Sequence, residues 1–194
     1  MNRRRFISRS LVLGAGLSTP LALTRTAFAA SMPADIVEMD ALSLSRAIEE
    51  SQVSCVEVMQ AYLAHIERYN PVYNAIVGMA EADDLLQQAR NADAEISRGE
   101  YHGWMHGMPH AVKDLQPVAG LRYTSGSPIF ADRISDRDSG MAAKLRAAGA
   151  IFIGKTNTPE FGLGSQSYNP VYGATGSAWN PDLTAGGSSG GAAS

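Results

Sequence analysis

Two segments of this 194-residue chain carry side chains suited to acid–base or nucleophilic chemistry. Lys113 follows the apolar run Pro109–Val112, so its amine either points into solvent or faces a site at the edge of a sheet. Burial at such a site disfavours the ammonium form, and a neutral amine is a usable base near neutral pH. Ser188 and Ser189 lie between the glycine pairs of the run 186–191. That run is typical of either a flexible linker or a tightly turned backbone that brings a hydroxyl close to another segment.

A third segment matches the phosphate-loop pattern GxxxxGK[ST] but lacks its structural context. Residues 149–156 read Gly-Ala-Ile-Phe-Ile-Gly-Lys-Thr. A phosphate loop needs a turn whose N–H groups point inward at phosphate, followed directly by a helix. Here the residues between the glycines are bulky and β-prone, and Pro159 follows soon after. The segment therefore predicts a buried strand rather than a nucleotide site.

Three histidines recur at four-residue spacing, at His102, His106 and His110. On a continuous helix this spacing would place three imidazoles on one face as ligands for a metal ion. Two glycines and a proline interrupt the segment and make such a helix unfavourable. We therefore expect polar loop histidines that lead into a strand, in preference to a metal site.

The elements that must position these segments alternate between helices and strands. Ser54 and Glu57 form a capping-box pattern, and apolar residues at three- and four-residue spacing continue from it until Asn70-Pro71 ends the helix. Further helices are predicted around residues 44–51, 82–98 and 141–148, and strands at 75–79, 109–112 and 150–153. This order predicts an α/β fold with helices packed on a sheet. Cys55 falls on the apolar stripe of its helix, which indicates a buried thiol without chemistry.

Residues 1–29 have the organisation of an export signal. They contain five arginines, three of them at positions 3–5, and none of the 19 acidic residues. The apolar stretch Leu11–Leu23 and the small-residue exit Ala27–Ala29 complete the pattern. The sequence Asn2–Ser8 resembles the twin-arginine export motif. We therefore expect a twin-arginine-type signal peptide at 1–29 and an exported, periplasmic product; an ordinary secretory signal and an N-terminal anchor are the alternatives.

Composition excludes two classes of function. The whole chain has a formal charge of −3, but all its acidic residues follow the basic leader, so residues 30–194 hold 11 basic and 19 acidic side chains. Such an acidic body argues against a nucleic-acid partner, because affinity for a phosphate backbone depends on basic side chains. The single cysteine excludes an internal disulfide framework and any CxxC metal or redox site.

Six motifs, taken in chain order, resemble those of the amidase signature family. They are Pro109–Asp114, Gly126–Pro128, Gly154–Gly162, Asn169–Thr175, Trp179–Pro181 and Gly186–Gly191. Each motif is weak alone, but the ordered set is specific and spans roughly residues 38–194. The resemblance implies the N-terminal part of the amidase signature fold, a mixed central β-sheet covered by helices. It also implies hydrolysis of a carboxylic amide C–N bond.

The resemblance assigns the members of a Ser–Ser–Lys triad. It implies that Lys113 is the catalytic lysine and that Ser188 is the bridging serine, which relays a proton from a second, nucleophilic serine to neutral Lys113. Ser189 is implied to support the site by hydrogen bonding. Backbone N–H groups beside the nucleophile stabilise the oxyanion, so the implied mechanism needs no metal ion or organic cofactor. The implied partner is a small-molecule or peptide amide.

The chain departs from the family pattern at its last residues. In the family the nucleophile lies in a Gly-Gly-Ser segment about two dozen residues beyond the bridging serine, whereas this sequence stops at Ser194. We therefore expect residues 30–194 to be the N-terminal portion of an amidase domain, truncated at the C-terminus and inactive alone. Two alternatives stay open: a non-catalytic binding or interaction module, and a part similar to the transamidating subunit of a tRNA-dependent amidotransferase. Export argues against the second, because its tRNA substrate is cytoplasmic.

Overall fold

The computed structural model describes residues 36–194, and the predicted export signal lies outside these residues. The helices are α1 (Ala41–Glu49), α2 (Cys55–Tyr73), α3 (Ala82–Ser97), α4 (Gly140–Ala147) and α5 (Gly190–Ala193), and the strands are β1 (Ile76–Val77), β2 (Pro109–Lys113), β3 (Ile151–Thr156), β4 (Tyr168–Asn169) and β5 (Gly173–Ala174). Three short 3-10 helices lie at Ile36–Glu38, Pro128–Phe130 and Glu160–Gly162. The alternating order confirms the predicted α/β fold.

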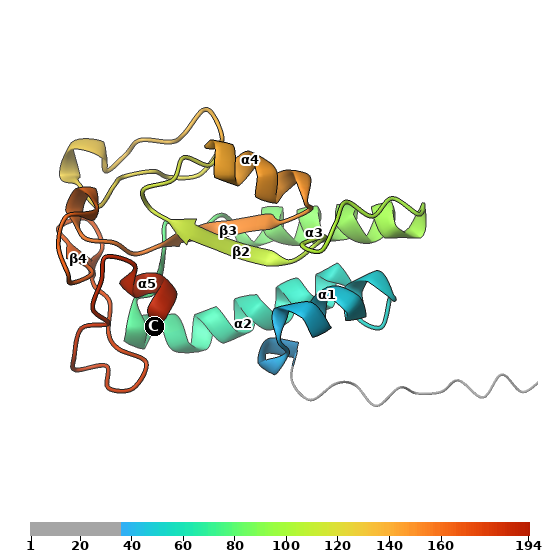
Figure 1. Ribbon diagram of the computed structural model, residues 1–194, viewed down its shortest axis with the longest axis horizontal. Coiled ribbons are helices and arrows are strands. Elements are labelled where there is room, and N and C mark those ends of the chain that lie inside the picture. The colour runs from blue at the N-terminus through green and yellow to red at the C-terminus, as the bar shows by residue number, and fades with distance from the viewer. Residues whose placement is uncertain (1–35) are drawn as a thin grey trace, which may run out of the picture. The chain divides into compact units, whose positions relative to one another are not determined.

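The central sheet is mixed and has the strand order β1-β3-β2. β2 and β3 are parallel and are connected through α4, whereas β1 pairs antiparallel with β3. Figure 1 shows α4 on one side of these strands and α1 and α2 on the other. β2 and β3 therefore end at the same edge of the sheet, close to the segment that forms α5.

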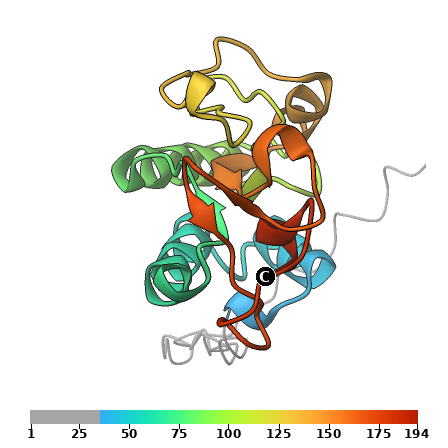
Figure 2. The same ribbon diagram turned by 90° about the vertical axis from the view of Figure 1, so that its left-hand side faces the viewer.

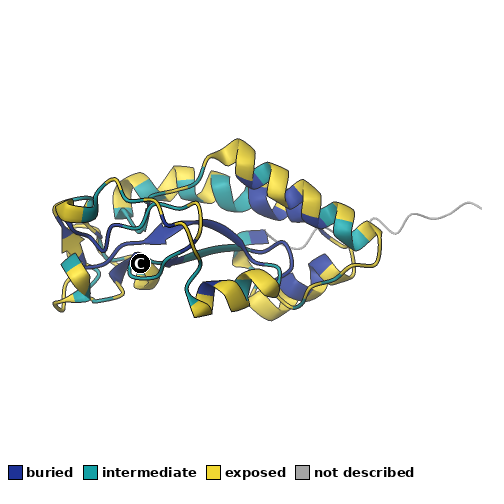
Figure 3. Ribbon diagram, turned by 90° about the horizontal axis from the view of Figure 1, so that it is seen from above, coloured by how far each residue is buried: buried dark blue, intermediate teal, exposed yellow. Residues whose placement is uncertain are grey.

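Two apolar clusters cover the two faces of the sheet. The larger joins α1, α2 and α3 to Ile151 and Ile153 of β3, and the smaller joins α4 to Val112 and Phe152. All six residues of β3 are buried, whereas most of β2 is half-buried, and Figure 3 shows these buried and intermediate strands between helices whose outward turns are exposed. The segment that matches the phosphate-loop pattern is thus a core strand, as its composition predicts. Within residues 36–194 no helix is long and apolar enough to cross a membrane.

The start of α2 confirms the predicted capping box and adds a cap from another helix. The Ser54 hydroxyl accepts from the Glu57 amide at 3.1 Å, and the Glu57 carboxylate accepts from the Ser54 amide at 2.8 Å. Asp93 of α3 accepts from the free amides of Cys55 at 2.7 Å and of Val56 at 3.2 Å. The Cys55 side chain is fully buried, as predicted, and burial raises the pKa of its thiol.

The end of α2 differs from the prediction, because the helix continues through Pro71 to Tyr73. Pro71 lies in the last turn of the helix, so the helix loses the one backbone hydrogen bond that an N–H at this position would donate and still ends only two residues later. Asn70 then organises the exit: its side chain accepts from the amides of Ala75 at 2.9 Å and Ile76 at 2.8 Å. Asn74 adopts a left-handed conformation with φ 49° and directs the chain into β1.

Candidate active site

The predicted site residues come together at the edge where β2 ends. Nζ of Lys113, the last residue of β2, donates to the Ser188 hydroxyl at 2.7 Å and to the Ser189 hydroxyl at 3.0 Å. The lysine and the first serine are 75 positions apart in the sequence. Figure 2 views the molecule from the end at which α5, β4 and β5 gather around this edge. The glycine-rich run is therefore a docked segment and not a free linker.

The surroundings of Lys113 favour its neutral form. Lys113 is half-buried, and desolvation lowers the pKa of its amine below the usual value. A neutral amine keeps two N–H donors and gains a lone pair. It can then accept the proton of Ser188 while it still donates to Ser189. The geometry therefore suits a base that acts through one hydroxyl and is oriented by the other.

A second lysine lies on the neighbouring strand but faces away from the serines. The register pairs Val112 with Lys155 and Lys113 with Thr156, so the two amines lie on opposite faces of the sheet. Lys155 is fully buried, and desolvation lowers its pKa to about 8. Its Nζ donates to the backbone carbonyl of Gln116. Although its pKa is shifted further, the hydrogen bond of Lys155 goes to a backbone carbonyl and not to a serine hydroxyl.

The serine segment is held in a space that admits only glycine at two positions. A Cβ atom on Gly190 would lie 2.4 Å from the Ser167 hydroxyl, and one on Gly191 would lie 2.2 Å from the Asn157 backbone nitrogen. The Gly190 amide donates to Ser167 at 2.8 Å, and the Thr158 hydroxyl donates to the Ser188 carbonyl at 3.2 Å. The Gly187–Ser188 peptide bond is cis. Close approach explains the two glycines that follow the serines.

A buried polar network supports this segment, and the sequence interpretation did not identify its members. The Asn157 amide donates to the Gly173 carbonyl at 3.1 Å and to the Thr175 hydroxyl at 3.0 Å, and its oxygen accepts from Asn169 at 2.7 Å. Asn169 also donates to the Thr158 carbonyl at 2.7 Å. Asn157, Thr158 and Thr175 are fully buried. The only sequence signal was their place inside two of the six motifs.

The motifs around Asp114 and Gly126 are joined by hydrogen bonds. The buried Asp114 carboxylate accepts from the amide and the hydroxyl of Thr124, and from the Gly126 amide at 3.4 Å. Burial raises the pKa of Asp114, and these hydrogen bonds oppose that effect. The Ser127 hydroxyl donates to Glu160 at 2.6 Å. Segments that the sequence presents as separate motifs are thus bonded to one another.

The three histidines do not form the single face that their spacing suggests. His110 lies in β2, with its ring edge-on to Phe152 at a centroid distance of 5.8 Å. His102 is exposed in the segment between α3 and β2, as expected. His106 also lies in this segment, as expected, but its side chain is buried and only 1% exposed. It tolerates burial because its two ring nitrogens lie 3.2 Å from the His102 amide and 3.0 Å from the Ala92 carbonyl.

Comparison with known proteins identifies the family. Residues 57–194 match the family model described as Amidase, and the chain aligns with solved structures of amidases over about four fifths of its length. The chain belongs to the amidase signature family. One solved member, a bacterial aryl acylamidase of this family, superposes with a TM-score of 0.73 at 29% identity, covering 79% of this chain and 32% of that one.

Two curated relatives of this amidase signature chain differ in function. The indoleacetamide hydrolase of Bradyrhizobium diazoefficiens is 37% identical over 157 residues, which are 81% of this chain and 30% of that protein. The A-type subunit of the glutamyl-tRNA(Gln) amidotransferase of Thermosynechococcus vestitus is 37% identical over 150 residues, which are 77% and 31%. The chain therefore spans about a third of the length of the curated relatives it matches.

Proposed function

We propose that this chain is the N-terminal portion of an amidase that hydrolyses a carboxylic amide C–N bond through a Ser–Ser–Lys mechanism. The observation that supports it most is the 2.7 Å contact between Nζ of Lys113 and the Ser188 hydroxyl. Neutral Lys113 takes the proton of Ser188, and Ser188 takes the proton of the nucleophilic serine. The same relay in reverse delivers a proton to the leaving amine. Ser189 holds the amine of Lys113 in place from the other side.

The nucleophile of this proposal belongs to sequence beyond Ser194. Among the described residues, Ser188 and Ser189 are the hydroxyls bonded to Lys113, and family resemblance assigns neither as nucleophile. We therefore propose that the 194-residue chain alone does not hydrolyse amides and that the oxyanion donors also come from the following sequence. The proposed mechanism uses no metal ion or organic cofactor.

The test is an amide-hydrolysis assay. It uses the longer protein that is obtained when the coding sequence is extended beyond the codon for Ser194. Three probes are taken from substrates that relatives and neighbours are named for: indoleacetamide, an aryl acylamide and a peptide amide. Lys113→Ala is expected to abolish hydrolysis, whereas Lys144→Ala, on an exposed turn of α4, leaves it unchanged. Hydrolysis that survives Lys113→Ala would refute the role of that residue. A downstream sequence without a Gly-Gly-Ser segment would refute the proposed nucleophile.

A second candidate function is that of the transamidating subunit of a tRNA-dependent amidotransferase. The 37% identity to the Thermosynechococcus vestitus protein supports this candidate. Such a role predicts release of ammonia from glutamine and no preference for the three probe amides. We favour the hydrolase because the chain carries a leader with five arginines and an acidic body. A glutaminase activity that exceeds hydrolysis of every probe amide would reverse this preference.

We also propose that residues 1–29 direct export to the periplasm by the twin-arginine route. Arg3 and Arg4 occupy the paired positions before Arg5-Phe6-Ile7. The double variant Arg3→Lys, Arg4→Lys is expected to keep the charge but leave the protein in the cytoplasm. Fractionation of cells that express either form measures how much of the protein reaches the periplasm. Equal amounts of both forms in the periplasm would indicate an ordinary secretory signal.

A further inference from the structure

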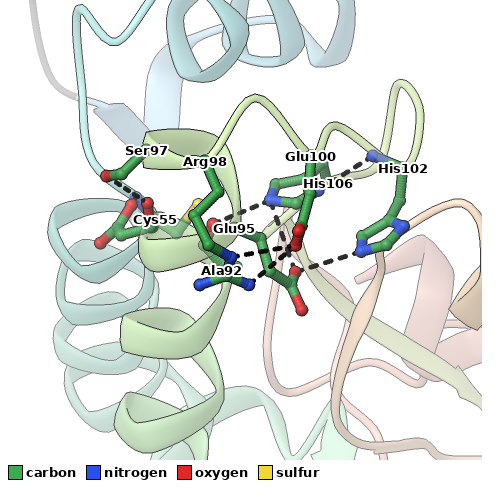
Figure 4. A network of polar contacts seen from close by, with 9 residues as sticks. Cys55, Ala92, Glu95, Ser97, Arg98, Glu100, His102 and His106 are labelled. Atoms are coloured by element: carbon green, nitrogen blue, oxygen red, sulfur yellow. Dashed lines mark hydrogen bonds and ion pairs between the residues drawn. The ribbon is translucent and has the colours of Figure 1, made fainter.

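A cluster of potential metal ligands lies away from the proposed active site, between α3 and β2. It consists of Glu95 in the last turns of α3, His102 and His106, whose ligand atoms all lie within 4.8 Å of one another. The Glu95 Oε2 atom is 3.2 Å from Nε2 of His102 and 4.0 Å from Nε2 of His106. Figure 4 shows dashed lines that join the Glu95 carboxylate to both rings. The rings themselves are stacked, with centroids 5.3 Å apart.

The distances suit a first-row divalent cation. Zinc binds histidine nitrogen and carboxylate oxygen at about 2.0–2.2 Å, so two ligands of one tetrahedral ion lie roughly 3.3–3.5 Å apart. The Glu95–His102 separation of 3.2 Å is just below this range, and the Glu95–His106 separation of 4.0 Å exceeds it by a shift that side-chain rotation can supply. Two imidazoles and one carboxylate are also the donor types that zinc accepts in three-ligand sites.

We propose that Glu95, His102 and His106 form a zinc-binding site through Oε2, Nε2 and Nε2, with a water molecule as the fourth ligand. The nearby Arg98 does not compete for the carboxylate, because its Nη2 pairs with Glu100 at 2.7 Å. The site joins the end of α3 to the segment that enters β2. Lys113 lies at the opposite end of that strand, so the ion stabilises the scaffold and takes no part in the proposed reaction.

Binding requires the His106 ring to exchange its hydrogen bonds. Nδ1 of His106 accepts from the His102 amide, so Nε2 carries the ring proton and donates it to the Ala92 carbonyl. Coordination through Nε2 needs the ring to rotate away from the Ala92 carbonyl and the proton to move to Nδ1, so both hydrogen bonds are given up for the bond to the metal ion.

The experiment titrates the untagged 194-residue chain with Zn²⁺ in competition with a chromophoric chelator. One equivalent is expected to bind. Glu95→Gln and His102→Ala are expected to weaken zinc binding at least ~100-fold. Loss of a residue that only hydrogen-bonds a metal ligand already lowers metal affinity roughly 10–100-fold. Both positions are partly exposed, so these variants are expected to fold, whereas substitution of buried His106 threatens the core. His65→Ala, which removes an exposed histidine of α2, is the matched control and keeps the affinity within about twofold.

Thermal unfolding gives an independent readout, because a ligand that binds only the folded state raises Tm. Zinc is expected to raise Tm of the unaltered chain and of His65→Ala but not of His102→Ala. A Co²⁺ complex with the intense visible absorption of four-coordinate cobalt supports the proposed geometry. The proposal is overturned if the unaltered chain binds no zinc at micromolar concentrations, or if His102→Ala binds it as tightly.

Discussion

Replacing Gly191 by alanine tests whether close packing positions the serine segment. Its Cβ would lie 2.2 Å from the Asn157 nitrogen and 2.4 Å from the Ala75 carbonyl, where ordinary contacts begin at 3.4 Å. Both neighbours are backbone atoms, so the segment must move by about 1 Å, and overpacking of this kind costs about 1–3 kcal/mol. Gly140 is the matched control, because it also lies in the first turn of a helix but has no heavy atom within 4 Å of the position that a Cβ would take. Gly140→Ala is expected to stabilise the chain by about 0.5–1 kcal/mol.

Urea unfolding measures the difference in unfolding free energy between the two alanine variants, which we expect to be about 1.5–4 kcal/mol. Hydrogen exchange supplies a local readout, because the Gly190 amide donates to buried Ser167 at 2.8 Å. This amide is expected to exchange faster in Gly191→Ala and at an unchanged rate in Gly140→Ala. Stabilities equal within about 0.5 kcal/mol, together with unchanged exchange at Gly190, would refute the packing argument.

Three further predictions concern buried groups. Asn157→Ala is expected to cost about 2–4 kcal/mol in urea unfolding, because it leaves several buried partners unpaired, whereas exposed Asn91→Ala stays within about 0.5 kcal/mol. Lys155 has a folded pKa of about 8 against 10.5, so the unfolded chain binds more protons between these values. The stability of the unaltered chain should therefore rise relative to Lys155→Met by about 2–3 kcal/mol from pH 7 to 10.5, and a difference independent of pH would contradict this. The Cys55 thiol, fully buried and with a raised pKa, is expected to react with a disulfide reagent only at the rate of unfolding, and rapid reaction in the folded chain would show that it is accessible.

The sequence alone determined the features that depend on near neighbours. The capping box at Ser54 and Glu57 needs only four consecutive residues, and the burial of Cys55 follows from helical periodicity. The bulky residues of 149–156 specified a strand in spite of the phosphate-loop pattern, because side-chain volume and β-propensity act locally. The order of the six motifs was sufficient to indicate the family without any contact between them.

Only the tertiary structure decided which distant groups meet. The β2–β3 register places Lys113 and Lys155 on opposite faces, and no local pattern distinguishes these two strand-end amines. The contact of Lys113 with Ser188 depends on closure of a 75-residue connection, and local patterns carry no information about such closure. In the same way, His102 and His106 come together with Glu95, whereas His110 does not join them. The reason is that the chain turns between α3 and β2 and His110 enters the sheet.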